Sequence, residues 1–369
     1  MEKALRILAI NPGSTSTKIA LFDDMEPLFI SSIEHSIDEL KEFAEVQDQL
    51  SYRTETVKRA MADNGYSLES VDVFAGRGGG VVPVSGGTYI VCDLMADHAA
   101  RAMSGGPHPA QLAPQIAKLF ADKFGKKAFV VNPPDVDEFC DLARVSGIKG
   151  LFRESHIHSL NQKEIALRFC ASRGLEYDNV NLVICHLGGG ISITAHSKGA
   201  MVDSNDIING TGPMTPTRAG DLPYMKVLDL AYSGEYTKKE LSDKLNKNGG
   251  LISHFGTASV PEIIEKIENG DKYAKLIIGG MIYQIAKYAG AMAVALLGKV
   301  DAIILTGAIA DNAYFTGALT EYLGWITDVV VMPHEVELEA LAAGALRVMR
   351  GEETPKKYTG IPVWDGFDI

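Results

Sequence analysis

The chain is organised around the stretch Asn11-Pro12-Gly13-Ser14-Thr15-Ser16-Thr17-Lys18. Residues 6–10 and 19–23 on either side are short apolar runs, whose aliphatic and β-branched side chains are typical of β-strands. The stretch between them combines an amide, a glycine and four hydroxyls. A tight turn of these residues would point backbone N–H groups and hydroxyls at one place, which is what a bound anion requires. A plain polar hairpin would use the same residues, so the stretch alone predicts only a strand, a turn and a strand.

Two further units repeat this pattern of an apolar strand followed by a turn of small residues. The apolar run at residues 180–186 leads into Leu187-Gly188-Gly189-Gly190 and a returning run at residues 191–196. The run at residues 300–305 leads into Thr306-Gly307-Ala308-Ile309-Ala310-Asp311-Asn312. Together the turns suggest a duplicated nucleotide-binding fold, in which two turns hold phosphates and the third holds the nucleoside.

The three turns resemble the two phosphate motifs and the adenosine motif of the superfamily of acetate and sugar kinases, heat-shock chaperone ATPases and actin. The residues themselves are similar to those of its carboxylate kinases, the acetokinase family, and within that family to butyrate kinases. The resemblance runs essentially from end to end. It implies an α/β fold of two duplicated ribonuclease H-like domains, with mixed sheets flanked by helices and a central nucleotide cleft. The implied domains are residues 1–150 plus 338–369, and residues 151–337.

The resemblance implies transfer of the γ-phosphoryl group of ATP to butyrate, with Mg²⁺, to give butyryl phosphate and ADP in a direct, reversible reaction. Kinases for isobutyrate, propionate or acetate remain alternatives. So does a nucleotide-gated ATPase of the same fold, although arginines in two glycine- and proline-rich loops favour a kinase. No P-loop signature and no GxGxxG turn after a strand is present, which argues against P-loop and Rossmann folds.

By resemblance, the nucleotide contacts come from all three turns. They are Asn11, Gly13, Ser14, Ser16, Lys18, Gly188, Gly189, Gly190, Gly307, Ala308, Ile309, Asp311 and Asn312. The resemblance also matches Arg77 and Arg218 to the arginines that flank the carboxylate and the transferring phosphoryl group. It matches His186 to a histidine at the second phosphate turn.

Two departures from the family pattern leave alternatives open. Acetate kinases carry Phe-His-Gly-Thr-Ser-His where this chain reads Phe152-Arg153-Glu154-Ser155-His156-Ile157-His158, so the catalytic histidine is His156 or His158, or Arg153 replaces it. The aspartate expected after residue 131 is Asn132 here. The Mg²⁺ carboxylate is expected to be Glu335 or Glu337. Asp135 or Asp137 acts beside it, unless a single carboxylate serves.

Arg77 is followed by three glycines, Gly78, Gly79 and Gly80, where acetate kinases hold bulky aliphatic residues. We expect the missing Cβ atoms to leave a hollow for an alkyl tail beside the guanidinium. The alternative is a flexible turn with an exposed arginine. The remaining expected substrate contacts are His108, Phe152 and Pro213.

Local signals predict several helix boundaries. A capping box at Ser36 predicts one amphipathic helix that ends near Gly65, and a second box at Ser159 predicts a helix that ends near Gly174. Residues 209–221 form a long loop without predicted structure, which is usually functional in a compact domain. The tail at residues 355–369 is expected to be an extended surface segment.

Bulk properties exclude several classes of partner. The 369 residues carry a formal net charge of −12, which argues against nucleic acid and anionic membranes. The four cysteines lack metal-binding spacing, which suggests reduced thiols in the cytoplasm. The apolar stretch at residues 276–297 is interrupted by Gln284 and Lys287, so a core helix is expected and not a membrane span. By resemblance, homo-oligomers are expected.

Overall fold

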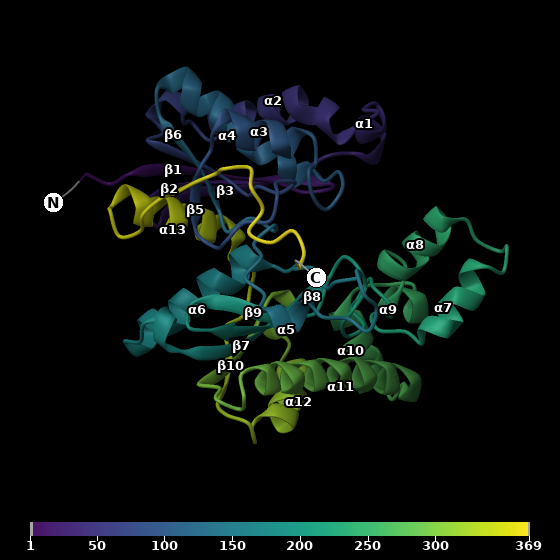
Figure 1. Ribbon diagram of the computed structural model, residues 1–369. Helices are drawn as coiled ribbons and strands as arrows, with labels where there is room; N and C mark the ends of the chain where they lie inside the picture. The colour runs from purple at the N-terminus through teal and green to yellow at the C-terminus, as the bar shows by residue number, and fades with distance from the viewer. Residues whose placement is uncertain (1–2, 368–369) are drawn as a thin grey trace. The chain divides into compact units, whose positions relative to one another are not determined.

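The computed structural model describes residues 3–367, and the chain divides into two compact units. Unit 1 contains Met1–Asp137, Ser159–Glu164 and Val336–Ile369, and unit 2 contains Glu138–His158 and Ile165–Glu335. Each unit is built on a mixed β-sheet with helices packed against it (Figure 1). The predicted domain boundaries near residues 150 and 338 stay predictions.

The sheet of unit 1 has the strand order β12-β5-β6-β4-β1-β2-β3. Its strands are β1 (Arg6–Pro12), β2 (Ser16–Asp23), β3 (Glu26–Glu34), β4 (Val73–Gly76), β5 (Thr88–Ile90), β6 (Lys127–Val131) and β12 (Lys356–Lys357). β1 pairs antiparallel with β2 and parallel with β4, which in turn is parallel to β6. The central strands β1 and β4 are almost entirely buried, as expected for apolar strands covered on both faces.

Helices cover both faces of this sheet (Figure 1). They are α1 (Ile37–Lys41), α2 (Leu50–Asp63), α3 (Asp93–Ala100), α4 (Leu112–Phe124) and α13 (Glu337–Met349), with short 3₁₀ turns η1 (Val46–Gln49), η2 (Leu68–Ser70) and η3 (Pro109–Gln111). α13 packs its alanine-rich face on β1, and Leu338, Leu341 and Ala345 belong to the same core as Ile7 and Val73. The C-terminal helix therefore returns to the first half of the chain.

Unit 2 has a five-stranded sheet in the order β11-β10-β7-β8-β9. Its strands are β7 (Asn181–Leu187), β8 (Ile191–Ser197), β9 (Ala200–Ser204), β10 (Ala302–Thr306) and β11 (Val329–Val331). Its helices and 3₁₀ turns are α5 (Asp141–Arg144), η4 (Tyr177–Asn179), α7 (Tyr224–Ala231), α8 (Lys238–Asn246), α9 (Gly250–Phe255), α10 (Val260–Glu268), α11 (Lys272–Ala295), η5 (Ala308–Asp311) and α12 (Ala313–Leu323), while α6 (Ser159–Arg173) begins in unit 1. α11 is apolar and long enough to cross a membrane, but nine of its residues are buried in the core of unit 2, so the expected core helix is confirmed.

The two sheets share one topology. In unit 1, an antiparallel meander of β1, β2 and β3 continues through parallel β4 and β6. In unit 2, an antiparallel meander of β7, β8 and β9 continues through parallel β10 and β11. The predicted fold of two duplicated α/β units is therefore confirmed.

Two local predictions were wrong. The helix expected from Ser36 to Gly65 breaks after Lys41, because the backbone N–H of Glu45 bonds to Asp48 and starts a new turn. Ser159 is the first residue inside α6 and not its cap. Its hydroxyl donates instead to the carbonyls of residues 132 and 133 at 3.0 and 2.7 Å.

The tail is not merely a surface segment. β12 adds to the sheet beside β5, and Tyr358 is buried where its hydroxyl lies 2.8 Å from His98 Nδ1. Residues 368 and 369 of the predicted tail lie outside the described residues. Val363 N also donates to Pro83 O at 2.9 Å, so the tail packs onto unit 1 beyond β12.

Candidate functional site

The first turn and Arg77 lie at the same edge of the unit 1 sheet. β1 and β4 are parallel with Ile10 opposite Gly76, and the backbone N–H of Arg77 donates to Ile10 O at 3.1 Å. Glu337 joins them from the first position of α13. It accepts from Asn11 Nδ2 at 2.7 Å and forms an ion pair with Arg77 Nη1. Arg77 Nε is buried and has no hydrogen-bond partner among the described residues, so one guanidinium donor remains for a ligand.

The β1–β2 turn presents donors that the protein does not use. Gly13 N donates to Ser16 O at 2.7 Å and closes the turn. Within residues 3–367, no hydrogen bond involves the N–H of Ser14 or Thr15, the hydroxyls of residues 14–16, or the Lys18 ammonium. Ser14, Thr15 and Lys18 are exposed. The turn therefore offers convergent N–H and hydroxyl donors to an anion.

The backbone conformation explains the three glycines that follow Arg77. Gly78, Gly79 and Gly80 have φ values of 79°, 132° and 71°, a region that other residues rarely adopt. A Cβ on Gly78 would lie 2.6 Å from Val130 Cγ1, and one on Gly80 would lie 2.8 Å from Gln111 Nε2. The space expected to be hollow is filled by protein at these two positions. Contact of the run with an acid stays a prediction.

His108 is a neutral acceptor in the same unit. Its Nδ1 accepts from the backbone N–H of Ala110 at 3.1 Å and caps η3, which places the ring proton on Nε2. Desolvation by the surrounding protein, and then the positive charges of Arg77 and Arg53, lower the pKa of His108. The residue still keeps exposed area.

In unit 2, three segments also follow the ends of parallel strands. β7, β10 and β11 are parallel neighbours, with His186 opposite Thr306. The turn at residues 188–190, the turn at residues 307–312 and the segment at residues 334–335 follow these strands. Because carboxyl ends of parallel strands meet at one edge, the second phosphate turn and the adenosine turn predicted from the sequence come together.

Two histidines and Arg218 lie at the second turn. The rings of His158 and His186 stack with centroids 4.0 Å apart, and His158 Nδ1 lies 2.8 Å from Ser192 Oγ. A Cβ on Gly190 would lie 3.4 Å from His158 Cε1 and would overlap Arg218 Nη1. Arg218 Nη1 is buried with no hydrogen-bond partner among the described residues. Burial lowers the pKa of Arg218, but a guanidinium remains protonated.

The loop that carries Arg218 is tied to the second turn and to α9. The hydroxyls of Thr215 and Thr217 donate to Gly189 O at 2.8 and 3.1 Å. Backbone N–H groups at the start of α9 donate to the carbonyls of residues 215–217. The close approach requires Gly250, whose φ is 55° and whose Cβ would overlap Thr215 O. The sequence analysis missed Gly250, although the Gly249-Gly250 pair was a visible signal.

α11 anchors this loop at two positions. Met214 N donates to Gln284 Oε1 at 2.8 Å, and the Tyr288 hydroxyl donates to Asp221 Oδ2. Asp221 Oδ1 also accepts from Gly212 N at 3.0 Å. Burial and the bond to Asp221 raise the pKa of Tyr288. The loop at residues 209–221, for which no secondary structure was predicted, is therefore held by hydrogen bonds to α11 and to the turn at residues 188–190.

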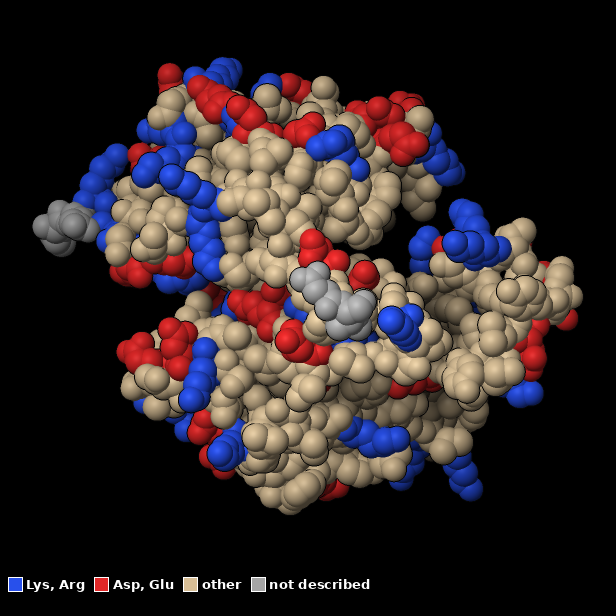
Figure 2. Space-filling model, viewed as in Figure 1, with Lys and Arg blue, Asp and Glu red and all other residues tan. Residues whose placement is uncertain are grey.

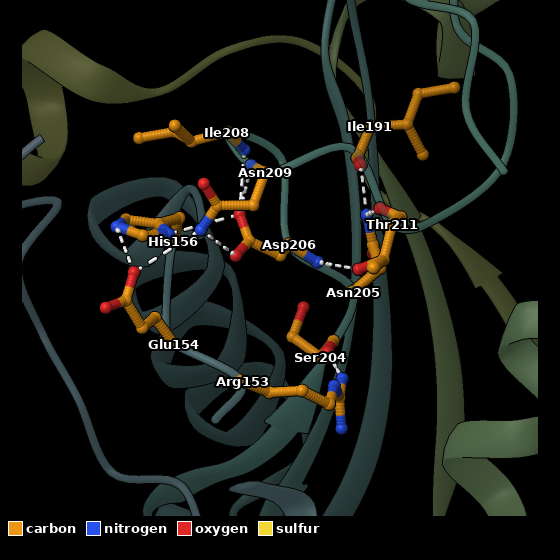
Figure 3. A network of polar contacts seen from close by, with 10 residues as sticks. All are labelled: Arg153, Glu154, His156, Ile191, Ser204, Asn205, Asp206, Ile208, Asn209 and Thr211. Carbon is orange, nitrogen blue, oxygen red and sulfur yellow. Dashed lines mark hydrogen bonds and ion pairs between the residues drawn. The ribbon is translucent and has the colours of Figure 1, made fainter. Parts of the chain in front are cut away.

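His156 belongs to a different network (Figure 3). Its Nδ1 lies 3.1 Å from Asp206 Oδ1, which also accepts from the N–H groups of residues 208 and 209. Burial alone would raise the pKa of Asp206, but the hydrogen bonds from His156 and the backbone outweigh it and lower the pKa. Arg153 bonds to Asp203 and to the carbonyl of Ser204. His156 organises the loop at residues 206–209 and Arg153 is tied to the end of β9, whereas His158 lies against the turn at residues 188–190.

A cavity of about 410 Å³ combines the second phosphate turn with the adenosine turn. Its lining includes the predicted nucleotide residues Gly188, Gly189, Ala308, Ile309, Asp311 and Asn312. The rest of its lining is the segment at residues 258–261, with Pro216. That segment was missed, although the Ser259 cap of α10 marked a helix start there.

Glu335 lies beside the turn at residues 188–190, and its neighbour His334 is held by the turn at residues 307–312. Gly307 N donates to His334 O at 3.3 Å, and His334 Nδ1 lies 3.0 Å from Asp311 Oδ2. A Cβ on Gly188 would lie 3.5 Å from Glu335 Oε1 and 3.3 Å from His186 Nε2. Glu335 thus lies at the second turn in unit 2, and Glu337 at the first turn in unit 1.

The predicted metal carboxylates do not form a cage. Asp135 accepts from Ser104 Oγ, and Glu337 is engaged by Arg77 and Asn11. Among the described residues no three His, Cys, Asp or Glu side chains are grouped so as to hold a metal. Mg²⁺ typically takes one or two carboxylates and completes its shell with waters and phosphates, so the carboxylates at each turn fit a phosphate-bound ion.

A second cavity, of about 530 Å³, lies beside Arg218. Ile191, Pro213 and Val227 are among its apolar lining residues, and Thr215 and Arg218 are among its polar ones. An apolar wall next to a guanidinium is the combination that a short fatty acid requires. Phe152, the other predicted acyl contact in unit 2, is half-buried.

Comparison with known proteins agrees with this arrangement. The acetokinase family model matches residues 150–328. A probable butyrate kinase from Listeria monocytogenes is 41% identical over 352 residues, which covers 95% of this chain and 99% of that protein. The chain belongs to the acetokinase family.

Two solved structures share the fold of this acetokinase-family chain. Acetate kinase from Porphyromonas gingivalis superposes with a TM-score of 0.75 at 18% identity, over 94% of this chain and all of that one. A propionate kinase from Francisella tularensis gives a TM-score of 0.72 at 18% identity, over 92% and 98% of the two chains. Kinases of this family use ATP, as the phosphate and adenosine turns predicted.

Proposed function

We propose that the protein transfers the γ-phosphoryl group of ATP to butyrate and forms butyryl phosphate and ADP reversibly. The similarity to a probable butyrate kinase over almost its whole length supports this substrate. One structural observation carries the reaction class. Arg77 in unit 1 and Arg218 in unit 2 each lie beside a phosphate-type turn, and each has a buried guanidinium nitrogen without a hydrogen-bond partner among the described residues.

The reaction needs positioning more than proton transfer. A carboxylate is ionised at neutral pH, and one of its oxygens attacks the γ-phosphorus while the bond to the β–γ bridging oxygen of ATP breaks. No general base is required. Arg77 and Arg218 are proposed to stabilise the carboxylate and the charge on the transferring oxygens. His158 and His186 are proposed to donate hydrogen bonds to the phosphoryl group at the second turn, and His156 supports the neighbouring loop through Asp206.

The first turn, with Asn11, Ser14, Ser16 and Lys18, is proposed to bind phosphate oxygens, and the cavity of about 410 Å³ the nucleoside. Mg²⁺, when bound with the nucleotide, neutralises phosphate charge. Glu335 or Glu337 is proposed to hold it, through water in either case. Glu337 also orients Arg77, because both its oxygens are occupied by Arg77 and Asn11.

The cavity beside Arg218 is proposed to take the alkyl tail, with Pro213 as one wall and Phe152, His108 and the Gly78–Gly80 run as further predicted contacts. Each buried CH₂ contributes about 0.8 kcal/mol, so two methylenes give roughly a tenfold preference for butyrate over acetate. Such a pocket weakens binding of shorter acids but does not exclude them. Butyrate and isobutyrate should be used best, propionate and valerate less well, and acetate poorly.

The proposal is tested by measuring acyl phosphate, trapped as its hydroxamate, with MgATP and each acid from acetate to valerate. ADP release without acid is measured in parallel. Butyrate-dependent acyl phosphate with little acid-independent ADP is expected. ADP release that no acid stimulates would identify a nucleotide-gated ATPase instead, and the highest kcat/KM with acetate would refute the proposed substrate.

We also propose a cytoplasmic homo-oligomer that binds neither nucleic acid nor membrane. All four cysteines are free, which suits a reducing compartment. On the face in Figure 2, Lys and Arg side chains are interspersed with Asp and Glu, so this face offers no uniform basic surface. Mass measurement of the native protein in solution tests the oligomeric state.

A further inference from the structure

Arg53 on α2 is the largest fully buried side chain of the described residues. Its guanidinium is held entirely by uncharged oxygens. Nη1 donates to Ser16 O at 2.7 Å and to Thr17 Oγ1 at 2.9 Å. Nε and Nη2 both donate to Gln49 Oε1, at 3.2 and 3.0 Å. No ion pair between residues 3 and 367 includes Arg53.

A buried charge without a counter-charge is unusual. Removing a guanidinium from water costs several kcal/mol, and buried charges are normally paired for that reason. Burial lowers the pKa of Arg53, yet an arginine stays protonated in proteins. Unit 1 therefore carries a fixed, dry positive charge that none of its described carboxylates neutralises.

This charge lies directly behind the first phosphate turn. Ser16 O, which accepts from Arg53, also accepts from Gly13 N and closes the turn. On the outer side of the same turn, the N–H groups of Ser14 and Thr15 have no partner among the described residues. The turn thus has unused N–H donors on one side and the unpaired guanidinium of Arg53 on the other. An anion bound at the N–H groups would accept their hydrogen bonds and would also offset the positive charge of Arg53.

A chain of hydrogen bonds fixes the orientation of the guanidinium. Because Thr17 Oγ1 accepts from Arg53, its proton can be donated to His35 Nε2 at 2.8 Å. His35 Nδ1–H then points to Tyr52 OH at 2.7 Å. Burial, and then the charge of Arg53, lower the pKa of His35, which keeps it neutral and able to accept.

We infer that Arg53 is a positioning residue of the nucleotide site, which shapes the first phosphate turn and supplies positive potential that the bound phosphate neutralises. The inference rests on the proposed phosphate role of this turn. It makes a distinctive prediction, because the charge is unfavourable without ligand and favourable with it. A residue that only supports the fold would show the opposite pattern.

The test replaces Arg53 and its partner together, in the variant Arg53→Met/Gln49→Leu, so that no buried amide oxygen is left unpaired. Thermal unfolding is measured without ligand, with MgADP and with MgATP, alongside kcat and KM. We expect an unchanged or higher Tm without ligand, because apolar replacement of a buried charge is often neutral or stabilising. The rise in Tm on adding MgATP should shrink, and the Kd for MgATP should increase about tenfold or more, as expected for losing a nearby favourable charge.

The matched control is Arg59→Met, which makes the same change at an exposed position of the same helix and should leave the nucleotide Kd unchanged. Arg53→Lys keeps the positive charge but removes the planar guanidinium, so its affinity for MgATP should lie between those of the wild type and the double variant. A lower Tm without ligand combined with normal MgATP affinity would overturn the inference, as would an equal loss of affinity in Arg59→Met. Nucleotide binding is read without any acid, so these results stand apart from whether butyrate is the substrate.

Discussion

Gly190→Ala tests whether the position of Arg218 at the second phosphate turn matters for turnover. Gly190 does not have a positive φ, so alanine is compatible with the backbone there. The added methyl group would overlap Arg218 Nη1 and would lie 3.2 Å from Arg218 Cζ. The guanidinium must therefore move away from the turn, while Thr215 and Thr217 still hold Gly189 O.

The expected loss follows from what Arg218 is proposed to do. Losing one preorganised donor to a developing charge typically costs about 2.7–4 kcal/mol, or roughly 10²- to 10³-fold in kcat. A displacement that preserves part of the interaction gives a smaller loss, so we expect kcat with butyrate and saturating MgATP to fall about 100-fold. The unfolding midpoint should change little, because Arg218 Nη1 makes no hydrogen bond within the described residues.

A double-mutant cycle separates this effect from general damage to the turn. If Gly190→Ala acts only by displacing Arg218, adding it to Arg218→Ala should cause no further loss of kcat. Full additivity of the two losses, or near-normal turnover in Gly190→Ala with intact folding, would refute the reasoning and remove Arg218 from the site.

Two further predictions concern stability. Gly250→Ala should lower the Tm markedly and reduce soluble yield, because Gly250 has a left-handed φ of 55° and no space for a Cβ beside Thr215 O. A Tm equal to that of the wild type would contradict the close approach of α9 to the loop that carries Arg218. The pKa of His35 is lowered by burial and by Arg53, so the unfolded chain binds this proton more readily. The free energy of unfolding should therefore fall as pH drops below about 6.5. His35→Gln removes the titrating group and should flatten the slope between pH 5 and 7 measured by urea titration.

The sequence predicted the strand–turn–strand units well because their signals are local. An apolar run followed by a glycine- or hydroxyl-rich turn needs no distant partner to be recognised, and the turns after β1, β7 and β10 occur where expected. The capping box at Ser36 is likewise present. The Ser159 box failed because tertiary contacts with residues 132 and 133 compete for the same hydroxyl.

The sequence was less informative about the structural role of each residue in these turns and loops. Gly78 and Gly80 were expected to leave space, but their backbone conformation and the packing of Val130 and Gln111 require glycine. His156 and His158 could not be distinguished by their two-residue spacing. In the structure they belong to separate networks, one with Asp206 and the other with His186.

By itself, the sequence determined the duplicated α/β architecture, the charged residues and the residues that form the turns. The reason is that strand periodicity, turn composition and residue type can be recognised from neighbouring residues alone. Only the tertiary structure decided which of those residues meet. Asn11 and Glu337 are 326 positions apart and yet hydrogen-bonded, because parallel strand order brings the ends of β1 and β4 to the start of α13. Arg53 was invisible as a functional residue for the same reason. Nothing in its neighbours shows that a buried, uncompensated charge would lie behind a turn 36 residues earlier.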